Sequence, residues 1–109
     1  MAAYSFHIAF YATGLRKDDL AAALSQLAPI SGRYGASHWA VYQSQDDLYK
    51  QVLIVDFADK GDFQKYWYGA EAQEFRAAMS GAYQNPVVYV PQNIVAEGSA
   101  VTTTAPAAA

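Results

Sequence analysis

The chain opens with a stretch in which large apolar side chains alternate with small or polar ones. From Tyr4 to Ala12 the two sets are Tyr4, Phe6, Ile8 and Phe10 against Ser5, His7, Ala9 and Tyr11. A period of two predicts a β-strand, which Thr13-Gly14 should end. From Lys17 to Ala28 the leucines recur at helical spacing, and Asp18 and Asp19 favour a helix start. We expect Pro29 to close this helix.

The rest of the chain predicts a hairpin, a second helical region and a last strand. Ser37 to Gln43 and Tyr49 to Phe57 predict strands joined by a polar turn. Residues 59–79 predict helix, and Gly69 near their middle predicts a kink or two short helices. Val87 to Val95 predicts a strand that contains Pro91, which cannot donate to a ladder and therefore predicts a sheet edge.

This order of elements, βαββαβ, predicts an α+β fold. Both helical regions should cover one face of a four-stranded antiparallel sheet, and right-handed crossovers place the first and third strands at its centre. Residues 1–96 are expected to form this single domain. Residues 97–109 contain mainly Gly, Ser, Thr, Ala and Pro, and we expect them to form a flexible, low-complexity tail.

The face of the sheet away from the helices is predicted to be apolar as well. The third strand carries Val52 and Ile54 on one side and Gln51, Leu53, Val55 and Phe57 on the other, and the last strand is apolar on both sides. Hydrophobic residues make up 53% of the chain and charged residues only 16%, which leaves few polar groups to cover this surface. We expect a homodimer joined through the open face; the alternative is a monomer with an exposed apolar face.

Charge and composition exclude several classes of function. The net charge of −3, with seven scattered Lys and Arg, argues against nucleic acid. Without cysteine there is no disulfide or thiolate nucleophile, and no apolar run approaches the length of a membrane helix. We therefore expect a cytoplasmic protein with no membrane contact. Two histidines on separate strands are too few for a metal site, so neither a metal nor another cofactor is expected.

The element order and one aromatic segment carry a resemblance to a known family. The helix Phe63-Gln64-Lys65-Tyr66-Trp67-Tyr68-Gly69-Ala70-Glu71, broken near its glycine, and the doubly apolar strands resemble the dimeric α+β barrel superfamily. Within it, the chain is most similar to small antibiotic-biosynthesis monooxygenase (ABM) type proteins. This resemblance implies a ferredoxin-like fold, a homodimer and a cavity between sheet and helices, in which several relatives oxidise phenols without metal or flavin. Haem-degrading members hold iron with a histidine on the second helix, and residues 59–83 contain none.

The two histidines are the candidate proton acceptors. His38 begins the second strand, where a cavity mouth would allow it to take a phenolic proton because imidazole titrates near neutral pH. Alternatively, His38 is satisfied by a backbone carbonyl at the strand end. His7 lies mid-strand beside Ser5 and Ala9, whose small side chains leave room either for a ligand or for close packing.

Aromatic side chains are the candidate substrate contacts. Planar substrates stack on aromatic walls, and tyrosine hydroxyls orient them. The candidates are Trp67, Trp39, Tyr42, Phe63, Tyr66 and Tyr83. Aromatic residues at helical spacing are also typical of an ordinary core, and this alternative stays open.

Two functional hypotheses follow. In the first, the protein is a cofactor-independent monooxygenase-like or isomerase-like enzyme acting on a small phenolic compound in a cavity between sheet and helices. His38, or a tyrosine acting through water, would remove the phenolic proton, while Trp67, Trp39 and Tyr42 would hold the ring. In the second, it is a non-catalytic dimeric small-molecule-binding or stress-related protein, whose interior is filled by its aromatic side chains.

Overall fold

The computed structural model describes residues 2–100 of the 109-residue chain. Its elements follow the expected α+β order: β1 (Tyr4–Tyr11), α1 (Lys17–Ile30), the 3₁₀ helix η1 (Ser31–Tyr34), β2 (His38–Gln43), β3 (Lys50–Phe57), α2 (Lys60–Trp67), α3 (Ala70–Ala78) and β4 (Tyr89–Asn93). Of the expected tail, residues 101–109 lie outside the described residues. Within residues 2–100, no helix is long and apolar enough to cross a membrane.

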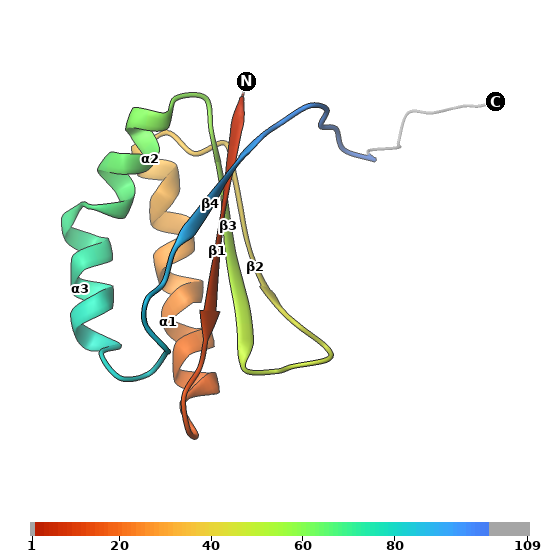
Figure 1. Ribbon diagram of the computed structural model, residues 1–109. Coiled ribbons are helices and arrows are strands. Elements are labelled where there is room, and N and C mark those ends of the chain that lie inside the picture. The colour runs from red at the N-terminus through yellow and green to blue at the C-terminus, as the bar shows by residue number, and fades with distance from the viewer. Residues whose placement is uncertain (1, 101–109) are drawn as a thin grey trace.

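The strands form one antiparallel sheet in the order β2-β3-β1-β4. The three α-helices all lie on one face, and the other face is left open (Figure 1). β1 and β3 are central, as the crossover rule predicts. β4 pairs only with β1, so Pro91 stands on an edge strand, where its missing N–H leaves the ladder intact.

The register of β1 against β3 determines which side chains the helices cover. Phe6 stands opposite Val55, and Ile8 stands opposite Leu53. All four are almost completely buried, as are Phe10 on β1 and Gln51 and Phe57 on β3 in the same alternation. The intervening positions, such as His7 and Ile54, face away from the helices and are only partly buried. The alternation read from the sequence is therefore the alternation of the fold.

Aromatic rings fill the space between the sheet and α2. Phe6 stacks on Phe63 with ring centroids 3.8 Å apart and planes only 2° from parallel. Phe63 in turn stacks on Trp67 at 6.2 Å. Tyr66 is 1% exposed and donates a 2.8 Å hydrogen bond to the carbonyl of Leu27 on α1. Burial raises the pKa of the Tyr66 phenol.

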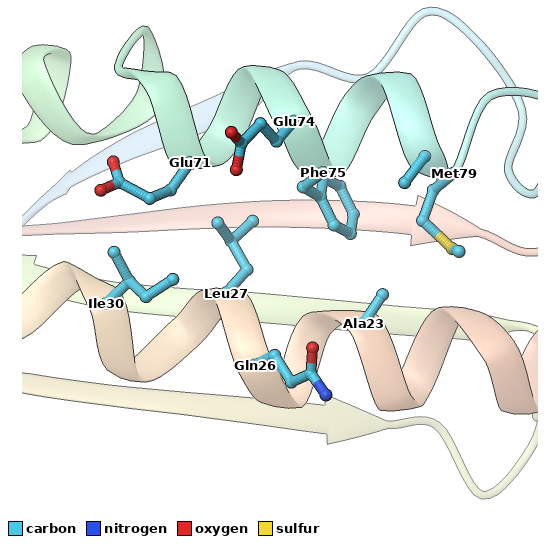
Figure 2. A pocket seen from close by; sticks show the side chains of 9 residues that line it. Ala23, Gln26, Leu27, Ile30, Glu71, Glu74, Phe75 and Met79 are labelled. Atoms are coloured by element: carbon cyan, nitrogen blue, oxygen red, sulfur yellow. The ribbon is translucent and has the colours of Figure 1, made fainter.

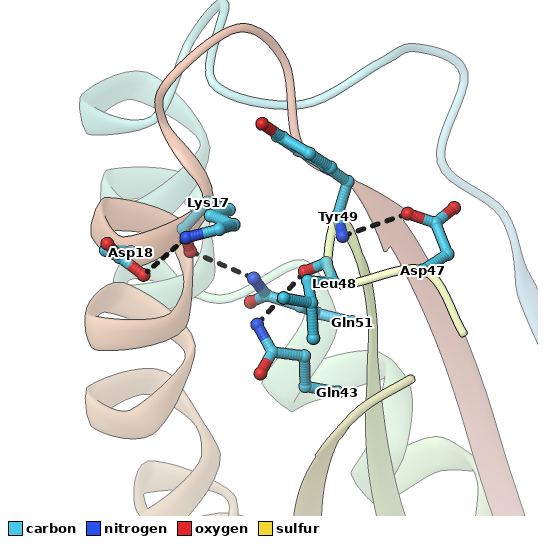
Figure 3. Close-up of polar contacts among 7 residues, drawn as sticks. All are labelled: Lys17, Asp18, Gln43, Asp47, Leu48, Tyr49 and Gln51. Carbon is cyan, nitrogen blue, oxygen red and sulfur yellow. Dashed lines mark hydrogen bonds and ion pairs between the residues drawn. The ribbon is translucent and has the colours of Figure 1, made fainter. Parts of the chain in front are cut away.

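One buried amide joins the sheet to the start of α1. Gln51 on β3 is completely buried, and its Nε2 donates a 2.9 Å hydrogen bond to the Lys17 carbonyl (Figure 3). Nearby, Gln43 donates to the Leu48 carbonyl, and the Tyr49 backbone N–H donates to Asp47, which shapes the β2–β3 turn. The hydrogen bond from Gln51 to Lys17 therefore joins the first turn of α1 to the end of β3 next to the β2–β3 turn.

Several element boundaries differ from those expected. Pro29 does not close α1, which continues through Ile30 and then tightens into η1. The φ angle to which proline is restricted is itself helical, so near a helix end Pro29 removes one donor without forcing the chain out. β4 begins at Tyr89 rather than Val87 and ends at Asn93, because its pairing with β1 covers only Tyr4 to Ile8.

The helical region divides at Gly69, as its sequence predicts. α2 ends at Trp67, and Gly69 is the residue that precedes α3. A Cβ at this position would lie 2.5 Å from the Lys65 carbonyl oxygen and 3.0 Å from the Tyr34 hydroxyl. The two helices therefore meet closely only because residue 69 has no side chain.

Gly69→Ala should destabilise the fold by about 1–3 kcal/mol, the usual cost of forcing extra atoms into a packed site. The matched control is Gly32→Ala, because an added Cβ there meets nothing within 4 Å. Urea unfolding followed by circular dichroism measures both variants. Equal stability of the two would contradict the close approach at Gly69.

Candidate functional site

A hollow of about 430 Å³ lies on the open face of the sheet, over β1, β3 and the segment that leads into β4. Its walls are mostly apolar, and three polar side chains join them. The lining residues are His7, Ala9, Tyr11, Lys50, Val52, Pro86, Val88 and Val90. Ligand sites typically have volumes of about 300–1,000 Å³ and combine apolar walls with a few polar groups. This hollow has both properties.

His7 is the titratable group at the centre of these strands. It stands opposite Ile54 on β3 and Val90 on β4. Its Nε2 lies 3.0 Å from Ser5 Oγ, in a hydrogen bond that holds the imidazole against the strand. In the tautomer in which Nε2 donates to Ser5 Oγ, Nδ1 carries a free lone pair that faces no other hydrogen-bond partner among residues 2–100.

A second polar pair lies at the far end of the hollow. Tyr11 and Lys50 are directly opposite each other in the register, and the Lys50 ammonium lies 6.0 Å from the centroid of the Tyr11 ring. The hollow therefore places a cation and a phenol hydroxyl along the same face as an imidazole, with Ala9 and Val52 between them.

His38 lies at another corner of the same face. Its Nδ1 is 3.5 Å from Asp56 Oδ2, and its side chain is 59% exposed, whereas that of Asp56 is 15% exposed. A separate hollow of about 380 Å³ surrounds this pair and is lined by Ala2, Ser37, His38, Asp56, Glu97 and Gly98. Two carboxylates and no aromatic wall distinguish it from the hollow at His7. In residues 2–100, no three His, Asp or Glu side chains converge as metal ligands.

The structure separates the aromatic candidates into two groups. Trp67, Phe63, Tyr66 and Tyr83 are at most 7% exposed and occupy the space between sheet and helices. Trp39 and Tyr42 on the edge strand β2 are 44% and 56% exposed. The expected pairing of His38 with Trp67 does not occur, because they lie on opposite faces of the sheet.

A third hollow runs between α1 and α3 on the outer side of the helices. Leu27 and Phe75 point toward each other across it, and Glu71 and Glu74 stand on its α3 side (Figure 2). Its volume is about 270 Å³. Glu71 already accepts a 2.6 Å hydrogen bond from Tyr34 and lies 3.9 Å from Arg33, so this carboxylate is engaged within the fold.

Similarity to known proteins is visible in the fold and not in the sequence. No protein-family model and no curated protein matches the chain. Among solved structures, a protein of unknown function from Nitrosomonas europaea is 17% identical, with a TM-score of 0.78 over 91% of this chain and 95% of that chain. A candidate antibiotic biosynthesis monooxygenase from Nitrosomonas europaea is 18% identical, with a TM-score of 0.74 over 82% and 95%. Another, from Bordetella bronchiseptica, is 18% identical, with a TM-score of 0.73 over 84% and 96%.

The chain has the ferredoxin-like α+β fold of these proteins. The expected resemblance to ABM-type structures is therefore confirmed at the level of the backbone. Identities below one residue in five carry no side-chain chemistry from one protein to another. The chemistry has to be argued from the residues of this chain.

Sequence reasoning named His7 and His38 but missed Lys50 and the pairing of His38 with Asp56. Ser5 and Tyr11 share the alternation of His7, so the pattern already placed them on one face. Lys50 and Asp56 reach that face only through the register of β3, which the sequence does not specify.

Tyr34→Phe should raise the pKa of Glu71, which the Tyr34 hydrogen bond holds below its ordinary value. Because that pKa is lowered in the folded state, the associated stability is present above the ordinary pKa. It is lost as the pH falls through the folded value. Arg33→Gln is the matched control and should change the pKa less, since Arg33 is the weakest contributor. Carboxyl NMR titration measures both, and a larger effect of Arg33→Gln would refute this ranking.

Proposed function

We propose that the protein binds a small planar phenol in the open-face hollow and acts on it as a cofactor-independent, monooxygenase-like enzyme with His7 as proton acceptor. The observation that carries this proposal is the presence of an imidazole in an apolar hollow of about 430 Å³. The fold shared with candidate antibiotic biosynthesis monooxygenases supports the reaction class. In this proposal His7, rather than His38, is the proton acceptor.

The side chains of the hollow suit the removal of a phenolic proton. Nδ1 of His7 takes the proton, while the hydrogen bond of Nε2 to Ser5 holds the ring in place. The Lys50 ammonium, which lines the far end of the same hollow, adds a positive charge that favours an anionic ligand there. The electron-rich phenolate then reacts with molecular oxygen, which is the oxidant. One oxygen atom forms a bond to the ring carbon para to the phenolate and becomes a quinone carbonyl, and the other leaves as water with the two hydrogens that the substrate loses.

The surroundings of His38 suit this step less well. Asp56 lies 3.5 Å from its ring, and Glu97 lines the same hollow. Two nearby carboxylates oppose the formation of a third anion because like charges repel. A phenolate would therefore form more readily beside Lys50 than beside His38.

We propose further that the protein is a homodimer joined through the open face. Val88, Val90 and Tyr42 on this face are 64%, 49% and 56% exposed, although they are large and apolar. A second copy would remove this surface from water and would also cover the hollow at His7. A covered hollow excludes water, which strengthens the electrostatic interactions within it.

The non-catalytic alternative is favoured by a different observation. The space between sheet and helices, where the resemblance implied a cavity, is occupied by stacked rings such as Phe6, Phe63 and Trp67. A protein that only binds a small molecule, without turnover, would also use the open-face hollow. Binding without oxygen consumption would support this alternative.

Ile54→Lys should convert the dimer to a monomer, because it places a charge at the centre of the open face. Sedimentation at micromolar concentration should give about twice 11.8 kDa for the original chain and the single mass for the variant. Leu15→Lys is the matched control, since Leu15 is 93% exposed and lies outside the sheet. A monomeric original chain would refute the dimer.

His7→Gln should lower turnover of anthrone by about 10²–10⁴-fold, which is the usual contribution of a positioned general base. Oxygen uptake measures the turnover, and calorimetry with 1-naphthol measures binding. Affinity for 1-naphthol should fall in His7→Gln and persist in His38→Gln. The reverse pattern would return the site to His38, and the absence of binding by the original chain would refute the proposed function.

A further inference from the structure

Lys50 is a positive charge without a counter-charge at one end of the open-face hollow. The residue is partly buried and lines the hollow together with Tyr11. Its ammonium lies 6.0 Å from the centroid of the Tyr11 ring, and among residues 2–100 no carboxylate lies within ion-pair distance of it. A cation that is partly removed from water without a partner is costly, so this end of the hollow favours the binding of an anion.

The strand register sets the distance between this charge and the proposed proton acceptor. His7 precedes Tyr11 by four positions on β1, and Lys50 stands directly opposite Tyr11. At a rise of about 3.3 Å per residue, the two ends of the hollow are separated by about 13 Å along the strands. A ligand of two or more fused rings suits this span better than a ligand of one ring.

The surface between the two ends is apolar. Ala9 stands opposite Val52 there, and Val88 and Val90 also line the hollow. Apolar walls hold flat ring systems, and the few polar groups of a site fix their orientation. The ligand that fits this arrangement has aromatic rings in its middle, a hydroxyl at the His7 end and a negative charge at the other end.

The donors at the Lys50 end favour a carboxylate over a phosphate group. Lysine contributes one compact positive charge, and Tyr11 contributes one hydroxyl that can donate a hydrogen bond. Within the described part of the chain, no arginine lines the hollow, so the forked donor that often binds phosphate is missing. A carboxylate carries one negative charge, which a single lysine neutralises.

We propose that the substrate is a hydroxylated polycyclic aromatic carboxylic acid, bound with its phenol at His7 and its carboxylate at Lys50. This inference rests on the proposed function and adds a specificity-determining residue to it. Lys50 pairs with the carboxylate, and Tyr11 donates a hydrogen bond to it. The same pairing compensates the charge of Lys50 when a second copy covers the hollow.

The experiment compares two ligands that differ by one carboxylate, 5-hydroxy-2-naphthoate and 1-naphthol. Calorimetry with the full chain near neutral pH, where the acid is ionised, gives both dissociation constants. The acid should bind about 10–100-fold more tightly, which is the usual contribution of a hydrogen bond between charged groups. The same comparison of 4-hydroxybenzoate with phenol should give a smaller ratio, because one ring does not span the two ends of the hollow.

Lys50→Met retains an unbranched side chain and removes its charge, so the preference for 5-hydroxy-2-naphthoate over 1-naphthol should disappear. Lys50→Arg retains the charge and should retain the preference. The matched control is Lys65→Met, which removes the same charge from an exposed position on α2, on the helical side of the sheet. Its preference for the acid should equal that of the original chain.

Two results would overturn this inference and leave the proposed function in place. The first is equal binding of 5-hydroxy-2-naphthoate and 1-naphthol by the original chain. The second is a preference for the acid that persists in Lys50→Met, with circular dichroism showing that the variant is folded. The failure of 1-naphthol and of the acid to bind would instead overturn the proposed function, and this inference with it.

Discussion

The register between β1 and β3 is the constraint on which the rest of this molecule depends. Because side chains alternate along a strand, a slip of one residue would turn Phe6 and Val55 outward and bring His7 and Ile54 under the helices. The stacked rings of Phe6 and Phe63 stabilise this register. A slip of one residue would replace Phe6 by Ser5 or His7, which have no phenyl ring to stack on Phe63. The same register aligns Ser5 with Asp56 on the open face. The β1–β3 register therefore determines both which side chains form the core and which polar side chains stand next to each other on the open face.

The packing of the helical side decides where a ligand can bind. Phe63, Tyr66 and Trp67 project from α2 into the space over the sheet, and their burial is nearly complete. Admitting a ligand there would separate stacked rings and break the Tyr66 hydrogen bond to Leu27. The open face requires no such rearrangement, because the hollow over Ala9 is already present between larger side chains. The fold is therefore compatible with the chemistry expected from the sequence, on the other face of the sheet.

Local pattern and topology rules predicted the fold well. The alternation of β1, the edge position of Pro91 and the break at Gly69 each follow from one physical property of a few neighbouring residues. The site was predicted less well, because its geometry depends on contacts between distant strands. His38 and Trp67 each had a plausible role when considered alone. Whether a strand residue and a helix residue share a face depends on the register, and here they do not.

The low identity to structural neighbours makes this distinction important. At 17–18% identity, the shared backbone indicates which surfaces exist, namely a sheet face covered by helices and one left open. It does not indicate which side chains occupy those surfaces. In this chain the open face combines exposed apolar residues with His7, Lys50 and the partly buried carboxylate of Asp56. Covering an apolar face is favourable, whereas covering a charge is costly unless that charge is paired. A partner that covers this face must therefore bury its apolar residues and leave Lys50 and Asp56 paired or in contact with water.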